Sequence, residues 1–166
     1  MADEAAEDPE ADQEQRLRIG SRERAAALIL YYDTSALVKL LIEEEGSELV
    51  RKLWGSTYMA VSSILAYPEG RAALAAAQRS GRVDQQDLRS SLRAFEAMQG
   101  GLISLGVDQR LAREAGRLAA DWDLRGYDAV HLATALDISE EELTFVTWDA
   151  DLARAAEKAG LAVAGA

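Results

Sequence analysis

Short apolar runs alternate with longer stretches of helical periodicity from about residue 25 onward, and this alternation restricts the fold more than any other feature. The clearest runs are LILYY at 28–32 and LTFVT at 143–147. Strands that are apolar on both faces are typical of parallel sheets covered by helices on each side. The pattern therefore predicts one three-layer α/β/α domain with a central parallel sheet.

The same reading gives approximate bounds for each element. Strands are expected at 28–32, 58–61, 102–105, 143–147 and 161–163. Apolar residues spaced three or four apart predict helices, at 35–41, 47–54, about 62–79, 84–98, 111–122, 127–137 and 149–158. Ser62 or Ser63 is expected to cap the third helix, and Gly46 to end the first.

Charge divides the chain into two parts. The net charge is −11, but residues 1–15 hold seven acids and no base, so the remainder carries only −4. Residues 1–23 have too little apolar surface to offset the entropy of ordering. We expect a disordered acidic tail over 1–23 and a folded domain over 24–166. Because the domain is near neutral, its charge does not exclude a nucleic-acid ligand. It does not indicate one either, because no basic stripe is present.

The composition also excludes some chemistry. There is no cysteine, which removes disulfides and thiolate metal sites. No apolar run has the length of a signal peptide or a membrane span. We expect a soluble, cytoplasmic protein.

Two aspartates directly follow predicted strands. Asp33 comes after LILYY, and Asp149 comes shortly after LTFVT and opens the last helix. Ligands of open α/β sheets bind at the carboxyl ends of strands, so both positions suit a site. Either residue could instead only cap the following helix. Asp151 could join the site or merely add favourable charge to that helix end.

Two further acids lie on predicted helices. Glu69 falls on the apolar side of its helix and needs a cation, which could be a metal or, in a salt bridge between helices, an arginine. Its neighbours Pro68 and Gly70 are both poor inside a helix. Asp128 is in a first turn, where the helix dipole alone could explain it. His131, the only histidine, is one turn further and is more typical of a core residue than of a ligand.

Taken together, these four acids predict a metal site at one edge of the sheet. Clustered carboxylates repel one another unless cations neutralise them. Oxygen ligands without thiolate suit magnesium or manganese. Such ions hydrolyse phosphodiesters by activating water and stabilising the leaving oxygen.

The segments around the acids resemble the motifs of PIN-domain ribonucleases, particularly VapC-type toxins of toxin–antitoxin pairs. The similar segments are YDTSALVK at 32–39, Glu69 followed by RAAL at 71–74, LRGYDAVHLA at 124–133 and TWDADL at 147–152. They occur in order over most of the chain outside the tail.

This resemblance implies a PIN-like nuclease domain over 24–166 with strand order 3-2-1-4-5. It implies RNA cleavage with Mg²⁺ or Mn²⁺, a homodimer and a cognate antitoxin. Asp33 and Asp128 would be the principal metal ligands, and Glu69 and Asp149 would complete the catalytic pocket. Thr147 would support the ligands or contact a phosphate.

Several alternatives remain at this stage. The same fold could process RNA without an antitoxin, or could bind RNA or protein without catalysis. A receiver or aspartyl phosphatase fits poorly, because Lys39 lies in a helical pattern and Ser35 replaces the second aspartate of the phosphatase motif.

An antitoxin could insert an arginine among the acids. Its helix would lie in an apolar groove, for which the expected wall residues are Leu37, Leu40, Leu41, Leu49, Leu53 and Trp54. The alternative, favoured for Leu37 and Leu41, is that these residues pack into the core.

Overall fold

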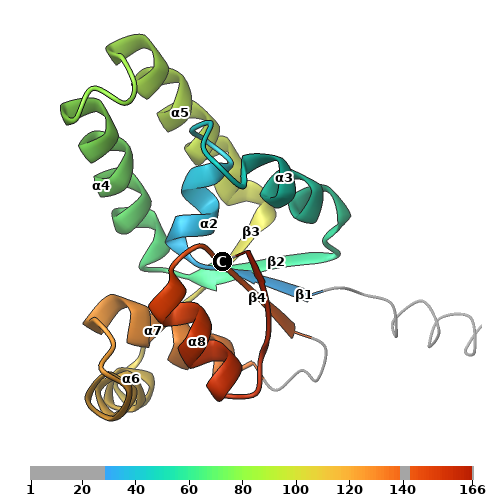
Figure 1. The fold of residues 1–166 in the computed structure, drawn as a ribbon, viewed down its shortest axis with the longest axis vertical. Coiled ribbons are helices and arrows are strands. Elements are labelled where there is room, and N and C mark those ends of the chain that lie inside the picture. Colours follow the sequence, from blue (N-terminus) through green and yellow to red (C-terminus); the bar gives the residue numbers. More distant parts are fainter. Residues whose placement is uncertain (1–28, 139–142, 166) are drawn as a thin grey trace, which may run out of the picture.

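The computed structural model describes residues 29–138 and 143–165, so the expected tail lies outside the described residues. Five parallel strands form a sheet in the order β3-β2-β1-β4-β5, as expected (Figure 1). The strands are β1 (Ile29–Tyr32), β2 (Met59–Ser63), β3 (Leu102–Leu105), β4 (Leu143–Thr147) and β5 (Ala162–Gly165).

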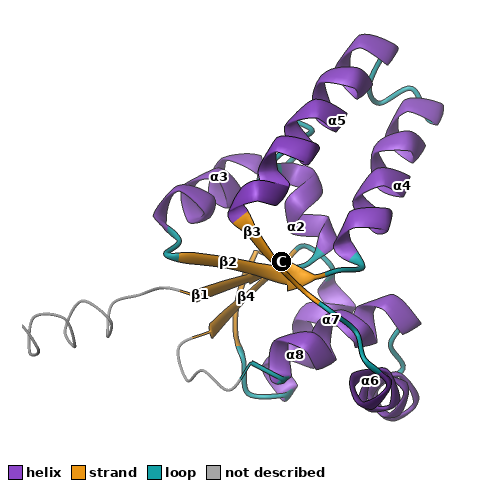
Figure 2. Cartoon of the chain, turned by 180° about the vertical axis from the view of Figure 1, so that it is seen from behind, coloured by secondary structure: helices purple, strands orange, loops and turns teal. Residues whose placement is uncertain are grey.

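Helices cover both faces of the sheet, which confirms the three-layer α/β/α class (Figures 1 and 2). One face carries α2 (Thr34–Lys39), α3 (Ser47–Ser56), α4 (Ala66–Arg79) and α5 (Gln85–Met98), followed by the short 3-10 turn η1 (Gln99–Gly101). The other face carries α6 (Gln109–Trp122), α7 (Gly126–Leu136) and α8 (Ala150–Lys158).

The central strand β1 shows how the apolar runs build two cores. Successive side chains of a strand point to opposite faces. Tyr31 accordingly packs with Leu132 and Leu152 beneath α7 and α8, whereas Tyr32 packs with Leu37 and Val50 on the other face. Both tyrosines are fully buried. A strand buried on both faces needs the unbroken apolar run that the sequence contains.

The start of α4 differs from the prediction. Ser62 and Ser63 do not cap this helix, because both are buried at the end of β2, where the Ser62 hydroxyl donates to the Tyr32 carbonyl at 2.6 Å. The helix begins at Ala66, so Glu69 lies in its first turn rather than in its middle. Pro68 fits there, because backbone N–H groups in a first turn have no partner within the helix.

Gly70 explains how α4 and α5 pack together beside Glu69. A Cβ atom at Gly70 would lie 2.6 Å from Cζ of Phe95, which is fully buried on α5. Only glycine permits this approach without a shift of the ring. Gly70, although a poor helix former, therefore allows α4 and α5 to pack closely.

The order of the strands determines where loops converge. Connections from β1 run toward β2 and β3 on one side, while β4 and β5 lie on the other. The junction of β1 and β4 is thus the topological switch point, where α/β folds form clefts at the carboxyl ends of strands. Asp33 follows β1 and Asp149 closely follows β4 at this edge.

Candidate active site at the carboxyl edge of the sheet

Asp33 forms the floor of the site. It is 4% exposed and caps α2, with its Oδ1 accepting from the Ala36 backbone N at 2.9 Å. Hydroxyls of Ser35 and Thr147 donate to the same carboxylate, at 2.7 Å to Oδ1 and 2.9 Å to Oδ2 respectively. Burial raises the pKa of Asp33, although the charge of His131 and these hydrogen bonds oppose it. The helix-capping and site interpretations of Asp33 are therefore compatible.

Two hydroxyls connect Asp33 to the loop after β4. The Thr147 hydroxyl is fully buried and accepts from the backbone N of Asp149 at 3.0 Å. The Ser35 hydroxyl accepts from the backbone N of Trp148 at 2.8 Å. Each hydroxyl thus forms hydrogen bonds both to Asp33 and to the β4–α8 loop. These bonds fix the position of Asp149 relative to Asp33.

Glu69 and His131 form the second part of the site. Nε2 of His131 lies 2.7 Å from Oε2 of Glu69, and Oγ1 of Thr34 donates to the same oxygen at 2.8 Å. Nδ1 of His131 lies 3.0 Å from the Tyr31 hydroxyl. An ionised carboxylate can only accept, so Nε2 carries the proton of its hydrogen bond to Glu69. Burial raises the pKa of Glu69, but the hydrogen bond and charge of His131, the hydrogen bond from Thr34 and the charge of Arg125 together lower the net value.

His131 is therefore both a core residue and a partner of the site. It is 2% exposed, as expected for a core histidine. The sequence predicted a metal or an arginine beside Glu69, and the structure instead places His131 of α7 there. Its position three residues after Asp128, on the same helical face, was the available signal for a role in the site.

Arg125 holds the outer part of the site and was not anticipated. Its Nε donates to Oδ2 of Asp128 at 2.7 Å, and its Nη2 donates to Oδ2 of Asp149. Asp128 lies in the first turn of α7, and Asp149 caps α8. Burial raises the pKa of Asp128 and the charges of Asp149 and Glu69 add to that rise, while Arg125 opposes it.

All four predicted acids line one cavity of about 230 Å³. Its other lining residues are Thr34, Ser35, Arg125, Tyr127 and His131. Thr147 contacts Asp33 from behind the cavity. Asp151 does not line it and pairs with Arg154 on the surface instead. Within residues 29–138 and 143–165, no three acidic or histidine side chains are close enough together to hold one metal ion as they stand.

The chemistry of the donors nevertheless fits a hard divalent ion. Every acid contributes carboxylate oxygens, and the neighbouring hydroxyls of Thr34 and Ser35 add further oxygen. Magnesium and manganese prefer such ligands. Two of the carboxylates already bind a cation, the Arg125 guanidinium. The cavity therefore attracts positive charge, and the donor set is suitable for a metal.

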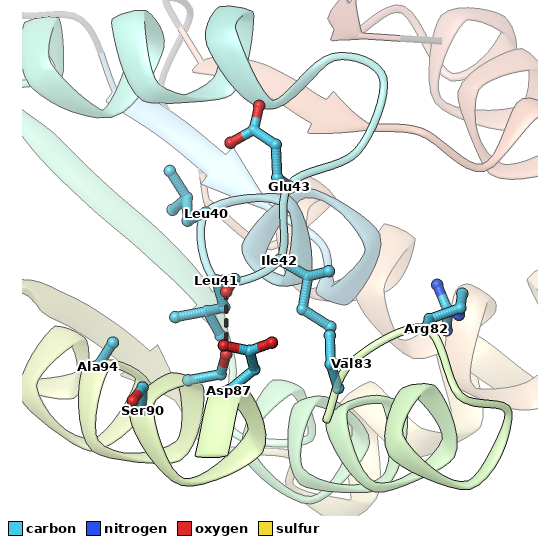
Figure 3. Close-up of a pocket in the computed structure, with 10 residues that line it drawn as sticks. Leu40, Leu41, Ile42, Glu43, Arg82, Val83, Asp87, Ser90 and Ala94 are labelled. Atoms are coloured by element: carbon cyan, nitrogen blue, oxygen red, sulfur yellow. Dashed lines mark hydrogen bonds between the residues drawn. The ribbon is translucent and has the colours of Figure 1, made fainter. Parts of the chain in front are cut away.

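A separate apolar groove differs from the expected one. A groove of about 480 Å³ is lined by Leu40 and Leu41 of the α2–α3 loop on one side and by Val83 and Ala94 on the other (Figure 3). Ser91 of α5 also lines this groove, and its hydroxyl donates to the Leu41 carbonyl at 3.0 Å. Of the remaining expected wall residues, Leu37 is fully buried in the core, Leu53 and Trp54 pack against that core, and Leu49 is exposed. Helix α3 therefore does not form the second wall, because its apolar face packs onto the sheet.

The sequence and the fold are both similar to those of known proteins. The profile of the PIN-domain family matches residues 30–158. The chain belongs to the PIN-domain family. This PIN domain is 42% identical to Ribonuclease VapC45 of Mycobacterium tuberculosis, over 83% of this chain and 96% of the relative. It is 34% identical to Ribonuclease VapC46 of the same species, over 81% of this chain and 95% of the relative.

Solved structures agree on the fold of this PIN domain. The crystal structure of Mycobacterium tuberculosis VapC20, a toxin that cleaves the sarcin-ricin loop, superposes with a TM-score of 0.61 at 16% identity. That match covers 80% of this chain and 95% of the other. Among the described residues, no helix has the length and hydrophobicity needed to cross a bilayer.

Proposed function

We propose that this PIN domain is a metal-dependent endoribonuclease that hydrolyses RNA phosphodiesters with Mg²⁺ or Mn²⁺. The observation that carries the proposal is the meeting of Asp33, Glu69, Asp128 and Asp149 in one cavity. They come from four separate segments of the chain. The similarity to ribonucleases of the VapC type supports the choice of RNA as the substrate.

Each acid has a distinct part in the proposed mechanism. Asp33 and Asp128 are the principal metal ligands, and Glu69 and Asp149 complete the pocket. The bound ion would activate water and stabilise the leaving oxygen. His131 orients the Glu69 carboxylate through its 2.7 Å contact. Thr147 fixes the direction of Asp33, because its hydroxyl donates to Oδ2 from a fully buried position.

An RNA-cleavage assay tests this proposal. Total cellular RNA is incubated with the full chain in Mg²⁺, Mn²⁺ or excess EDTA, and new 5′ ends are mapped. Cleavage is expected with either metal and not with EDTA. Asp33→Asn and Asp128→Asn should abolish cleavage, because each removes ligand charge.

Asp151→Asn is the matched control. This acid lies two residues after Asp149 but outside the cavity, so its loss should leave the cleavage rate unchanged. Full cleavage in EDTA would exclude a metal mechanism. RNA binding without cleavage in either metal would instead favour a non-catalytic PIN-like scaffold.

We further propose that the protein is the toxin of a toxin–antitoxin pair and acts as a homodimer. A cognate antitoxin would place an arginine in the acidic cavity, and an amphipathic helix in the groove between the α2–α3 loop and α5 (Figure 3). The pairing of Arg125 with two of the acids supports this, since the cavity accommodates a guanidinium. The groove is apolar at Leu40, Leu41 and Val83, with Glu43 and Asp87 at its sides.

Competition between partner and metal tests the antitoxin proposal. Titrating Mn²⁺ into the purified complex should weaken it, and replacing the partner's arginine should restore cleavage. An affinity that is indifferent both to Mn²⁺ and to Asp128→Asn would exclude inhibition through the cavity. Light scattering of the free protein gives the subunit count, for which two is expected.

A further inference from the structure

Arg125 is the basic side chain that joins the two outer acids of the cavity. Its guanidinium spans from Asp128 on α7 to Asp149 at the start of α8. The side chain is 74% exposed, and α7 begins at the next residue. One exposed cation thus occupies oxygens of two proposed metal ligands.

Neither aspartate depends on Arg125 for its place in a helix. Oδ1 of Asp149 caps α8 by accepting from the backbone N atoms of Asp151 and Leu152, both at 3.0 Å. Its other oxygen, Oδ2, is the one that Arg125 binds. Asp128 lies in a first turn, where the helix dipole favours an anion with or without a partner. Arg125 therefore binds oxygens that are not needed for helix capping.

The geometry makes this ion pair easy to displace. The Arg125 side chain is 74% exposed, so water solvates the guanidinium whether or not it is paired, although Asp128 and Asp149 are only 17% and 24% exposed. A divalent ion carries twice the charge of the guanidinium and competes for the same oxygens. Arg125 then stays tethered next to the site by its own backbone, at the N-terminus of α7.

We propose that Arg125 is a displaceable counter-ion that neutralises Asp128 and Asp149 before metal binds and then binds a phosphate of the RNA backbone. This inference rests on the proposed function, since it assumes that the cavity binds metal and RNA. A guanidinium suits a phosphate because it donates two parallel hydrogen bonds. Metal binding would thereby create the RNA contact as well as the reaction centre.

The inference predicts effects of opposite sign for one substitution. Arg125→Ala removes a competitor of the metal, so the affinity for metal should rise. The same change removes a phosphate contact, so the affinity for RNA should fall. If Arg125 only held α7 and α8 in place, its loss would misplace the ligands and weaken metal binding.

Calorimetric titration of Mn²⁺ into the full chain, without RNA, tests the first effect. Because the lost guanidinium is exposed and competes only weakly, Arg125→Ala should bind Mn²⁺ roughly three- to tenfold more tightly than wild type. Arg110→Ala is the matched control, since Arg110 is similarly exposed and bonds Asp137 at 2.7 Å outside the cavity. Its affinity for Mn²⁺ should equal that of wild type.

The salt dependence of RNA binding tests the second effect. Binding of a labelled single-stranded RNA is followed by fluorescence anisotropy in Ca²⁺, which also binds oxygen ligands, and the recovered RNA is checked for length. Arg125→Ala should reduce the slope of log K against log salt by about 0.7, the value for one phosphate contact on a single strand. Arg125→Lys keeps the charge and should keep the slope.

The outcomes separate this inference from the function on which it rests. Binding of Mn²⁺ by wild type with equal or weaker binding by Arg125→Ala overturns the counter-ion role alone. An unchanged salt slope overturns the phosphate contact. Binding of Mn²⁺ by neither protein overturns the proposed metal site and this inference together.

Discussion

Replacing Asp33 by asparagine should abolish activity and yet stabilise the metal-free protein. Asp33 is 4% exposed, and the ion pairs of the cavity go to the other three acids. Asparagine can keep the cap, because its side-chain oxygen can accept from Ala36 N as the carboxylate does at 2.9 Å. The hydroxyls of Ser35 and Thr147 can turn to accept from the new amide.

The net effect follows from two opposing contributions. Exchanging a charge-assisted cap for a neutral one costs about 1 kcal/mol. Removing a buried carboxylate that has no adjacent ion-pair partner recovers part of a desolvation penalty of several kcal/mol. We therefore expect a net gain of about 1–2 kcal/mol, which corresponds to a rise in Tm of roughly 2–8 °C for a domain of this size.

The gain should depend on pH in a defined direction. Burial raises the pKa of Asp33 above the ordinary 3.8, so the unfolded chain ionises first as pH rises. The neutral carboxyl group of Asp33 contributes stability to the folded wild type. This contribution is complete below about pH 3.8 and is lost as pH rises through the folded pKa of Asp33. The side-chain amide of the Asp33→Asn variant does not titrate. The advantage of the variant should therefore be small in acid and complete at neutral pH.

Thermal unfolding in EDTA and in Mn²⁺ measures this directly. In EDTA at pH 7, Asp33→Asn should melt above wild type, and the control Asp151→Asn should match wild type because this acid is exposed. Mn²⁺ at a hundred times its Kd should stabilise wild type by about 2.7 kcal/mol and reverse the order. A lower Tm for metal-free Asp33→Asn at pH 7 would refute the reasoning.

Three further predictions concern other parts of the chain. His131→Ala should lower the free energy of unfolding in urea by about 2–4 kcal/mol, because Glu69 and the Tyr31 hydroxyl both lose a buried partner. The wild-type pKa of Glu69 is lowered, so the stabilising contribution of Glu69 is present above about pH 4.5 and is lost as pH falls through its folded pKa. His131→Ala should therefore lose less stability in acid than wild type does. Equal pH profiles of stability for the two proteins would contradict this role of His131. Tyr32→Phe should leave stability equal or up to about 1 kcal/mol higher, since the buried hydroxyl has no hydrogen-bond partner among the described residues, and a loss above about 1 kcal/mol would show that it has one. Deleting residues 1–23 should leave Tm within about 1–2 °C, because a segment so poor in apolar residues has little surface to bury, and a large drop would show that the tail docks on the domain.

The sequence predicted the layers of this fold well because they depend on local periodicity. LILYY and LTFVT have the unbroken apolar character typical of strands buried on both faces, and residues 29–32 and 143–147 form the adjacent strands β1 and β4. The resemblance also anticipated the strand order and the four acids that meet in the cavity. Element ends were less certain, as at α4, where Ser62 and Ser63 belong to β2 because they pair with Ser104 and Leu105 of β3.

What only the tertiary structure decided is which groups neutralise those acids. The sequence established that Glu69 needs a partner, but His131 lies 62 residues away, and only the folded arrangement of α7 and α4 brings its ring to the carboxylate. Arg125 likewise appears near Asp128 in the sequence, yet its bond to Asp149 depends on how α7 and α8 meet at the switch point. Hydrophobic periodicity is a local property that a single segment carries. Compensation of charge depends on distances of a few ångströms between distant segments, and only the packed chain specifies those distances.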